Sequence, residues 1–482
     1  MPAAALVFAQ KVSKNKNIFV LVLVPALLIF FRLGEPQQWV YDEMFRITSA
    51  QKYLNGVFFL ENHPPLGKLL IALGKYLYDP NTTPEYIAVD WIEQDLPMEF
   101  EVVGFRIAPA LFGVFVPVLF YFLVIKITDN RKLGLAGALI LAFDNLYLIL
   151  SRIAILDIFL LFFILAALIL FFDLYLHPEK GNLSKFLLLG ALTACAMGVK
   201  DTGAILLLPI VLLLFRCKSI SGSSIKTASY FIVSLITLVV IYLGIWQIHF
   251  SIARNMIDGH DYGVSSSYQS ILGNNYSGNF FSRFYIQFSE AFAYHFNYNK
   301  TVAPLKLGDS DEIGSPWYYW PLGGKAINTR WFTSDYKHYS YIYLFGNPIS
   351  WLFSLLGVIL GTATVLADMF FHFLQQAEQK KILYILVFLY WAYMLPFWFV
   401  TRATYIHHYL PALVLGLLIM VLFLHLSSSN SGHMQYVLLT VVFITVAAFW
   451  YYKPFVYFEP LTEQQFQIRN LWPLWQLKCI GC

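Results

Sequence analysis

The stretch that decides the fold is residues 39–75, WVYDEMFRITSAQKYLNGVFFLENHPPLGKLLIALGK. The adjacent carboxylates Asp42 and Glu43 come about ten residues after the end of the first apolar segment. Twenty residues later the chain reads HPPLGK, at positions 63–68. Nearly all of the remaining chain is apolar and poor in charge. A polar cluster just outside one membrane span, followed by many more spans, indicates an enzyme that works at a membrane surface.

The composition is that of an integral membrane protein. Hydrophobic residues make up 59% of the 482 residues and charged residues only 12%, with a mean hydropathy of +0.62. A soluble domain carries about 25% charged residues. The apolar runs must be helices, because a chain in lipid has to satisfy its own backbone polar groups, and the alternating pattern of a β-barrel is absent. The net charge of +4 comes from short basic clusters between spans, which indicate topology and not nucleic-acid binding.

We predict an all-α polytopic protein with about eleven transmembrane helices, because apolar runs of roughly 17–25 residues recur along the chain. The predicted spans are 18–31, 102–125, 133–150, 153–176, 186–199, 203–215, 228–248, 344–370, 382–400, 405–426 and 435–451. Lys11, Lys14 and Lys16 flank the first span, and positive flanks stay inside. The N-terminus is therefore predicted inside and the C-terminus outside.

This topology divides the chain into three predicted parts. Residues 1–248 form an N-terminal transmembrane module with the first outer loop, 33–100. Residues 249–343 form a large outer loop, and residues 344–482 form a C-terminal four-span module with an outer tail. In the first outer loop, the spacing predicts amphipathic helices at 44–54 and 66–78. The second begins just after Pro64-Pro65, where proline is well placed.

The same topology places a set of ionisable residues on the outer side, several of them within the first turn of a span. They are Asp42, Glu43, His63, Lys68, Arg106, Arg152, Asp157, Lys200, Arg402, His407 and His408. Taken alone, each could snorkel to the interface or form a structural pair. Together, carboxylates and cations on one face indicate a site that binds an anion and moves a proton.

The chemistry follows from these residue types. Arg and Lys can hold a phosphate, and a carboxylate beside it can take a proton from an attacking hydroxyl. A lipid-phosphate sugar offers both a phosphate at the headgroup level and a good leaving group. Asp42 and Glu43 would point about 100° apart on a helix, so one can act as base while a cation holds the other. Asp42, Glu43 and His63 could bind a metal, but no zinc-type spacing is present, and we expect no obligatory metal.

The second outer loop is rich in Tyr, Trp, Asn, Ser and Gly, and its most distinctive piece is GSPWYYWPL at 314–322. It contains Trp317 and Trp320. Aromatic and amide side chains suit the recognition of a sugar or a peptide, although an interfacial aromatic belt explains any single Trp equally well. In the tail, Cys479 and Cys482 could form a disulfide if that side faces an oxidising compartment.

Seven segments resemble the protein O-mannosyltransferases, membrane glycosyltransferases of the multi-span GT-C type. They are YDE at 41–43, HPPLGK at 63–68, FRIAPALFG at 105–113, DNLYLILSRIAILDIFLLFF at 144–163, GVKDTG at 198–203, SPWYYWPL at 315–322 and HHYLPA at 407–412. They occur in the family's order and spacing and extend over most of the chain. HPPLGK, the S-R-x-x-x-L-D segment and HHYLP are specific together, whereas any one alone is weak.

The resemblance implies transfer of mannose from a polyprenyl (dolichyl-type) phosphate to Ser or Thr hydroxyls of secreted or membrane proteins at the outer face, with inversion. Asp42 then matches the catalytic base, with Glu43 beside it. Candidates for holding the donor phosphate or the acidic pair are Arg106, Arg152 and Lys200, with His407 and His408 at the donor. Candidates for lining the site are His63, Lys68, Asp157, Trp317, Trp320 and Arg402.

The chain also departs from this family. Eukaryotic members carry a β-trefoil-type insert in the large outer loop, which here has only about 95 residues and no repeated strand pattern. We therefore expect a short prokaryotic member in the plasma membrane, and since relatives often pair, a dimer is an open expectation. A close alternative is transfer of the sugar to a lipid or an envelope glycan. A transporter is a remote alternative. It predicts charges at mid-span depth and two matching halves, whereas here the charges cluster near one surface and the halves do not match.

Overall fold

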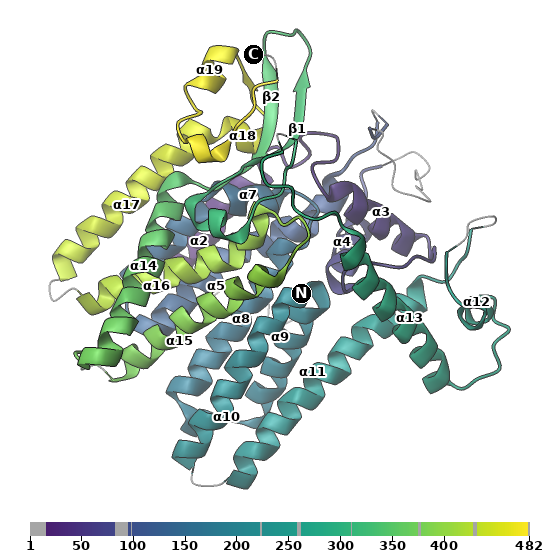
Figure 1. The fold of residues 1–482 in the computed structure, drawn as a ribbon, viewed down its shortest axis with the longest axis horizontal. Coiled ribbons are helices and arrows are strands. Elements are labelled where there is room, and N and C mark those ends of the chain that lie inside the picture. The colour runs from purple at the N-terminus through teal and green to yellow at the C-terminus, as the bar shows by residue number, and fades with distance from the viewer. Residues whose placement is uncertain are drawn as a thin grey trace.

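The computed structural model describes residues 16–81, 95–97, 99–221, 224–257, 262–309, 311–374, 377–427 and 431–480. Lys11 and Lys14, on which the predicted orientation partly rests, lie outside these residues, as do Cys482 and positions 82–94 of the first outer loop. The fold is mostly helical, as predicted, with long helices running side by side and a small sheet at one end (Figure 1).

The first half of the chain forms a packed set of apolar helices. They are α2 (Lys16–Phe30), α3 (Glu43–Leu54), α4 (Leu66–Leu77), α5 (Val103–Thr128), α6 (Arg131–Ala142), α7 (Asn145–Arg152), α8 (Asp157–Leu176), α9 (Leu183–Val199), α10 (Leu207–Ser221) and α11 (Ser224–Ile252). Helix α5 packs against α2, α4 and α8, and α9 packs between α8 and α11. α3 and α4 confirm the two helices predicted in the first outer loop.

The second half adds four helices to the bundle (α14 to α17), two helices outside it (α12 and α13), two short helices near its end (α18 and α19) and a small sheet. Its elements are α12 (Ser266–Leu272), α13 (Phe280–Thr301), β1 (Ile327–Thr333), β2 (Tyr339–Leu344), α14 (Pro348–Phe371), α15 (Ala377–Met394), α16 (Leu410–Ser427), α17 (Ser431–Tyr452), α18 (Pro454–Tyr457), β3 (Pro460–Leu461) and α19 (Glu463–Gln467). α14 and α16 touch along their backbones, since a Cβ added to Gly357 would lie 2.4 Å from the Gly416 carbonyl oxygen. Small residues allow this close approach between membrane helices.

The predicted count of eleven spans is not confirmed. Within the described residues, seven helices are long and apolar enough to cross a membrane, or eight if one bent pair counts as a span. The predicted spans 18–31 and 186–199 correspond to α2, of which 15 residues are described, and to α9, which has 17 residues. At 1.5 Å per residue these described lengths are below the thickness of a hydrocarbon core of about 30 Å, and neither helix is among the seven.

Two further predicted spans are interrupted. The run 133–150 is not one helix but α6 and α7, which are bent by 65°. The break comes at Asp144, whose carboxylate accepts the N–H of Tyr147 at 3.0 Å and so caps a new helix. The run 203–215 begins as the 3₁₀ helix η2 (Asp201–Leu206) and only then becomes α10.

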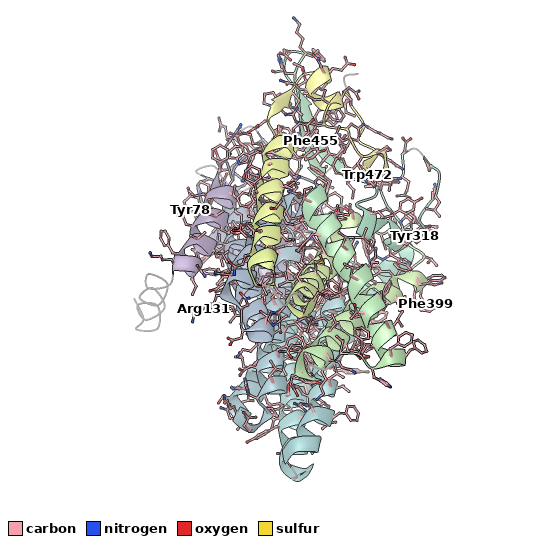
Figure 2. The ribbon with its side chains drawn as sticks, turned by 90° about the vertical axis from the view of Figure 1, so that its left-hand side faces the viewer. Tyr78, Arg131, Tyr318, Phe399, Phe455 and Trp472 are labelled. Carbon is pink, nitrogen blue, oxygen red and sulfur yellow. The ribbon has the colours of Figure 1, made fainter. Side chains whose placement is uncertain are left out.

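The large outer loop contains a sheet that the sequence patterns did not indicate. β1 pairs antiparallel with β2, from Ile327 opposite Leu344 to Thr333 opposite Tyr339. β3 in the C-terminal tail pairs with the start of β2. The sheet packs on a cluster of buried aromatic side chains that includes Phe455 and Phe466. Away from the sheet, Tyr318, Phe399 and Trp472 project from one side of the molecule as exposed rings (Figure 2), a position typical of a membrane interface.

One fully buried ion pair fixes α3 against α5. Arg106 Nε donates to Glu43 Oε1 at 2.8 Å, and Arg106 Nη2 donates to Glu43 Oε2 at 2.7 Å. The remaining N–H groups of Arg106 donate to the carbonyl oxygens of Leu33, Pro36 and Gln38. All five donors of the guanidinium are thus used. The pair therefore holds the whole turn that leads into α3.

We expect Glu43→Gln to destabilise the protein by about 3 kcal/mol, because it leaves the buried Arg106 charge without a counter-ion. Thermal unfolding in detergent should show this as a lower Tm. Arg32→Gln is the matched control, since its pair with Glu35 has side chains exposed by 37% and 42%, and such pairs contribute at most about 1 kcal/mol. Equal Tm values for the two variants would contradict the anchoring role of Glu43.

Candidate active site

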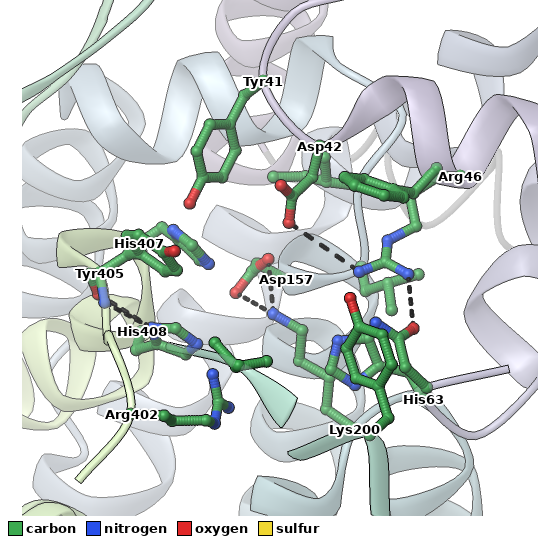
Figure 3. Close-up of a pocket in the computed structure, with 16 residues that line it drawn as sticks. Tyr41, Asp42, Arg46, His63, Asp157, Lys200, Arg402, Tyr405, His407 and His408 are labelled. Carbon is green, nitrogen blue, oxygen red and sulfur yellow. Dashed lines mark hydrogen bonds and ion pairs between the residues drawn. The ribbon is translucent and has the colours of Figure 1, made fainter. Parts of the chain in front are cut away.

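A cavity of about 190 Å³ lies where the start of α3, the start of α8 and residues 402–408 meet. Its polar lining residues are Tyr41, Asp42, Arg46, Asn62, His63, Asp157, Lys200, Tyr298, Arg402, Tyr405, His407 and His408. Figure 3 shows the carboxylates of Asp42 and Asp157 pointing into the space between Arg46 and the His407–His408 pair. Residues far apart in the sequence therefore share one polar chamber.

Asp42 is placed in the cavity by the turn that precedes α3. It is the N-cap residue of that helix, but its side chain makes no capping hydrogen bond and is free to point inward. Tyr41 before it adopts a left-handed backbone with φ of 55°, which costs a non-glycine residue free energy. Edge contacts of the Tyr41 ring with Tyr405 and His407, at centroid distances of 6.0 and 5.4 Å, hold this turn.

Arg46 lies one helical turn after Asp42 and faces the same cavity. Its Nη2 is 3.9 Å from Asp42 Oδ2, so the carboxylate has only a loose ion pair. Its Nη1 donates to Asn62 Oδ1 at 3.4 Å. Arg46 thus connects the carboxylate to the chain segment that carries His63.

The Asn62-His63 corner is held by groups outside the cavity. The ammonium of Lys68 donates to the His63 carbonyl at 3.0 Å and forms a buried ion pair with Glu61. The ring of His295, from α13, lies 2.8 Å from the Asn62 carbonyl and 2.8 Å from Asp201 Oδ2. These contacts fix the position of the HPPLGK segment beside the cavity.

The opposite wall contains a second, tight ion pair. The Lys200 ammonium lies 2.8 and 2.9 Å from the two carboxylate oxygens of Asp157. Both residues are buried, with 8% and 4% of their surface exposed. Asp157 is therefore fully engaged, whereas Asp42 is not.

Arg402 supplies a cation without a carboxylate partner among the described residues. Its Nη1 donates only to the Ala403 carbonyl, at 3.3 Å. The segment is fixed by a backbone bridge between Pro304 and Arg402. Beyond it, His407 and His408 stack with ring centroids 4.3 Å apart. The Nδ1 atom of His407 is buried without a hydrogen-bond partner.

The charges of the cavity favour a bound anion. Asp42 and Asp157 contribute two negative charges, and Arg46, Lys200 and Arg402 contribute three positive ones, so these five groups sum to +1. Loss of hydration raises the pKa of Asp42, and the nearby Arg46 and Lys200 oppose that rise. Loss of hydration and the surrounding cations lower the pKa of His63 well below its ordinary value, so His63 is neutral at pH 7.

The structure brings together most of the residues singled out in the sequence. Those that line the cavity are Asp42, His63, Asp157, Lys200, Arg402, His407 and His408. Glu43, predicted beside Asp42 as catalytic, does not line it, because its carboxylate is fully buried and bonded to Arg106. Arg106 uses its side chain in the same pair, so it holds one carboxylate of the acidic pair, which is one of the two roles predicted for it. Neither residue lines the cavity.

The other predicted residues lie behind the cavity. Arg152 donates to backbone carbonyl oxygens at the end of α2, among them Ile29 and Arg32, and therefore caps that helix instead of binding a phosphate. Lys68 is fully buried in its pair with Glu61. Trp320 is buried and stacks on His408 at 5.9 Å, and Trp317 contacts Trp398 at 6.0 Å. Neither Trp lines the cavity.

Sequence reasoning missed several lining residues: Tyr41, Arg46, Asn62, Tyr298 and Tyr405. The spacing of Asp42 and Arg46, four residues apart on a predicted helix, is a usable signal, since such side chains are neighbours on one face. Asn62 and Tyr298 carry no comparable signal. In the described part of the chain, no three His, Cys, Asp or Glu side chains gather to hold a metal ion, and the expectation of metal independence stays a prediction.

Two family models match the chain. "Dolichyl-phosphate-mannose-protein mannosyltransferase" matches residues 19–257, and "C-terminal four TMM region of protein-O-mannosyltransferase" matches residues 284–475. Among curated relatives, Protein O-mannosyl-transferase 1 of Danio rerio is 29% identical over 280 residues, 54% of this chain and 38% of the relative. Dolichyl-phosphate-mannose–protein mannosyltransferase 1 of Candida albicans is 27% identical over 270 residues, 53% of this chain and 30% of the relative. The matched region is thus well under half the length of these relatives.

The fold is similar to that of a solved chain of the Saccharomyces cerevisiae protein O-mannosyltransferase Pmt1–Pmt2 complex bound to the sugar donor. The TM-score is 0.81 at 16% identity, and the match covers 97% of this chain and 93% of the other. The apo oligosaccharyltransferase of Archaeoglobus fulgidus matches with a TM-score of 0.51 at 10% identity, over 94% of this chain and 58% of the other. These likenesses confirm the predicted fold class. Since the two family models together extend over most of its length, the chain belongs to the protein O-mannosyltransferase family.

Proposed function

We propose that the chain transfers a mannosyl group from a polyprenyl-phosphate carrier to Ser or Thr hydroxyls of proteins, with inversion at the anomeric carbon. One observation carries the proposal. A single cavity holds both a carboxylate with only a loose ion pair, Asp42, and, among the described residues, a guanidinium without a carboxylate partner, Arg402. A base and an anion-binding group in one chamber are what this transfer requires. The names of the matched relatives support mannose as the sugar and protein as the acceptor.

In the proposed reaction Asp42 is the general base. The acceptor hydroxyl gives its proton to Asp42 as its oxygen attacks the anomeric carbon. The bond from that carbon to the acceptor oxygen forms while the bond to the phosphate oxygen breaks, and the phosphate leaves with the electron pair. A single displacement of this kind inverts the anomeric centre and needs one base and no protein nucleophile.

In this scheme the leaving phosphate binds at Arg402. A guanidinium can hold two phosphate oxygens at once, and its charge is not already neutralised by a neighbouring carboxylate. Lys200 is close but shares its charge with Asp157, so we assign it a supporting role. His407, with its unpartnered Nδ1 atom, is the proposed contact for a sugar hydroxyl.

We also propose that the cavity faces the outer side of a prokaryotic plasma membrane, with the N-terminus inside and the C-terminus outside. The positive-inside rule supports this orientation. Lys180 lies between α8 and α9, Lys185 in the first turn of α9 and Arg216 in the second half of α10, all toward the helix ends farthest from the cavity. A disulfide at Cys479 fits a tail in an oxidising compartment.

The proposal also includes two expectations from the sequence analysis, metal independence and dimer formation. Transfer is proposed to need no metal, since the basic residues of the cavity already supply positive charge for the phosphate. A dimer is proposed as the working form, and it is supported by the solved relative, which is a complex of two different protein O-mannosyltransferase chains.

We expect Asp42→Asn to lower kcat by about a hundredfold or more, because the amide cannot accept the proton of the hydroxyl. The measurement is transfer of radiolabelled mannose from a polyprenyl-phosphate donor to a Ser/Thr-rich peptide in liposomes. Asp335→Asn, in the turn between β1 and β2, is the control and should keep native activity. Native transfer by Asp42→Asn would remove Asp42 as the base, and transfer only to a lipid or glycan would overturn the protein acceptor.

We expect Arg402→Gln to raise the KM for the donor about tenfold or more, since a charge-assisted bond to the phosphate is lost. Donor titrations in the same assay measure this. Arg330→Gln is the matched control, because Arg330 pairs with Asp95 at the sheet and not in the cavity. An unchanged donor KM in Arg402→Gln would place the phosphate elsewhere.

The pH dependence should show the ionisation of Asp42. Only the ionised carboxylate accepts a proton, and burial raises its pKa, so kcat/KM should fall on the acid side with a midpoint above the ordinary value of about 4. Arg46 favours the ionised form, so Arg46→Gln should move this midpoint to higher pH. A midpoint that is the same in Arg46→Gln and native protein would contradict the assignment.

A further inference from the structure

A second cavity, of about 140 Å³, lies between the end of α11, α12 and the start of α13. Figure 1 shows these three helices together at one edge of the molecule. The cavity is lined by Arg254 and Arg283, by the amides of Gln247 and Gln287, and by the rings of Phe250 and Phe284. It shares none of its lining residues with the candidate active site.

Among the described residues that line it, this cavity has an excess of positive charge. No carboxylate is among the described residues that line it. Arg254 is exposed, and its side chain makes a long hydrogen bond, 3.4 Å from Nε to the Phe250 carbonyl oxygen. Arg283 donates to the carbonyl oxygens of Gly278 and Tyr276, which fixes its direction but leaves its charge uncompensated. Two such guanidinium groups around one small cavity attract an anion.

A second observation points to a ligand that also carries a donor group. The Oε1 atom of Gln247 is buried without a hydrogen-bond partner, while its Nε2 atom donates to Ser251. A buried acceptor without a partner is costly unless something fills the gap. A ligand with a phosphate beside a hydroxyl group could accept hydrogen bonds from the two arginines and donate one to the Gln247 oxygen.

The cavity lies just beyond the end of a candidate span, which is the depth at which lipid headgroups lie. Arg254 comes two residues after the candidate span 228–252. The next segment is tied to the loop between α3 and α4, since the N–H groups of Arg254 and Asn255 donate to the Gly56 carbonyl. The cavity therefore lies on the same side of the membrane as the active site. Exposed apolar side chains of α11, such as Ile236 and Val240, continue below it and offer a surface for acyl chains.

We propose that this cavity binds the phosphate headgroup of an anionic membrane phospholipid, with Arg254 and Arg283 on the phosphate and Gln247 on a headgroup hydroxyl. The cavity is large enough for a headgroup and too small for a whole lipid, whose chains stay in the bilayer. Basic residues at the end of a span are the usual contacts of anionic headgroups. The exposed rings of Phe280, Phe281 and Tyr285 beside the cavity suit the same interfacial depth.

The test is binding of dioctanoyl phosphatidylglycerol to the full chain in neutral detergent, followed by native mass spectrometry, with dioctanoyl phosphatidylcholine as the comparison lipid. We expect the native chain to prefer phosphatidylglycerol, and Arg254→Gln to weaken that binding about tenfold. Arg254→Lys should lose less, since it keeps the charge. Arg254 is exposed, so these variants should fold, and an unchanged Tm checks this.

The matched control is Lys337→Gln, which removes one exposed positive charge from the turn between β1 and β2. It should bind phosphatidylglycerol like the native chain. Equal losses in Lys337→Gln and Arg254→Gln would show a general charge effect and overturn the site. Binding of sn-glycerol 3-phosphate as tight as that of the lipid, with the same dependence on Arg254, would make this a soluble-phosphate site and overturn the lipid assignment.

Discussion

The ion pair between Glu43 and Arg106 is the constraint on which the active site depends. Two charges without exposed surface are stable only as long as every oxygen and every N–H group has a partner, and here the neighbouring backbone supplies the remaining partners. The backbone N–H groups of Val40 and Ala154 both donate to the Glu43 carboxylate. The pair therefore ties together the turn before α3, the start of α5 and the turn before α8. Because Asp42 directly precedes Glu43 in the chain, fixing Glu43 also fixes the direction in which Asp42 points.

Two charged residues of the cavity form a tight ion pair with each other, and two others have only loose contacts. Asp157 and Lys200 neutralise each other through two short contacts, and they shape the wall without leaving the site strongly charged. Asp42 and Arg402 are held much more loosely. A substrate that brings a hydroxyl and a phosphate can therefore meet a proton acceptor and a cation without first breaking a strong pair. The tight pairs give rigidity, and the loosely held groups are those to which we assign the proposed chemistry.

The sequence was sufficient to predict that polar residues from distant segments meet at one end of the helices, because the order of the apolar runs places them there. It correctly grouped Asp42, His63, Asp157, Lys200 and the 402–408 segment. It could not predict the rotation of each helix, which decides whether a side chain faces a cavity or a neighbouring helix. Lys68, which was predicted to line the site, faces Glu61 instead for this reason. The Asp144 carboxylate that caps α7 also accepts hydrogen bonds from the Asn347 N–H and the Ser350 hydroxyl, and β3 pairs with β2 across more than a hundred residues. Local patterns contain neither of these distant contacts.

The wide separation of the cavity walls along the chain has a consequence for biosynthesis. Asp42 and His408 are 366 residues apart (408 − 42). At about 5–20 residues per second, a ribosome needs about 20–70 s to make the intervening chain. During that time the base has been synthesised but the wall that carries Arg402 and the two histidines has not. If the proposed function is right, the nascent chain cannot transfer a sugar until the 402–408 segment has been made and has packed beside α3 and α8.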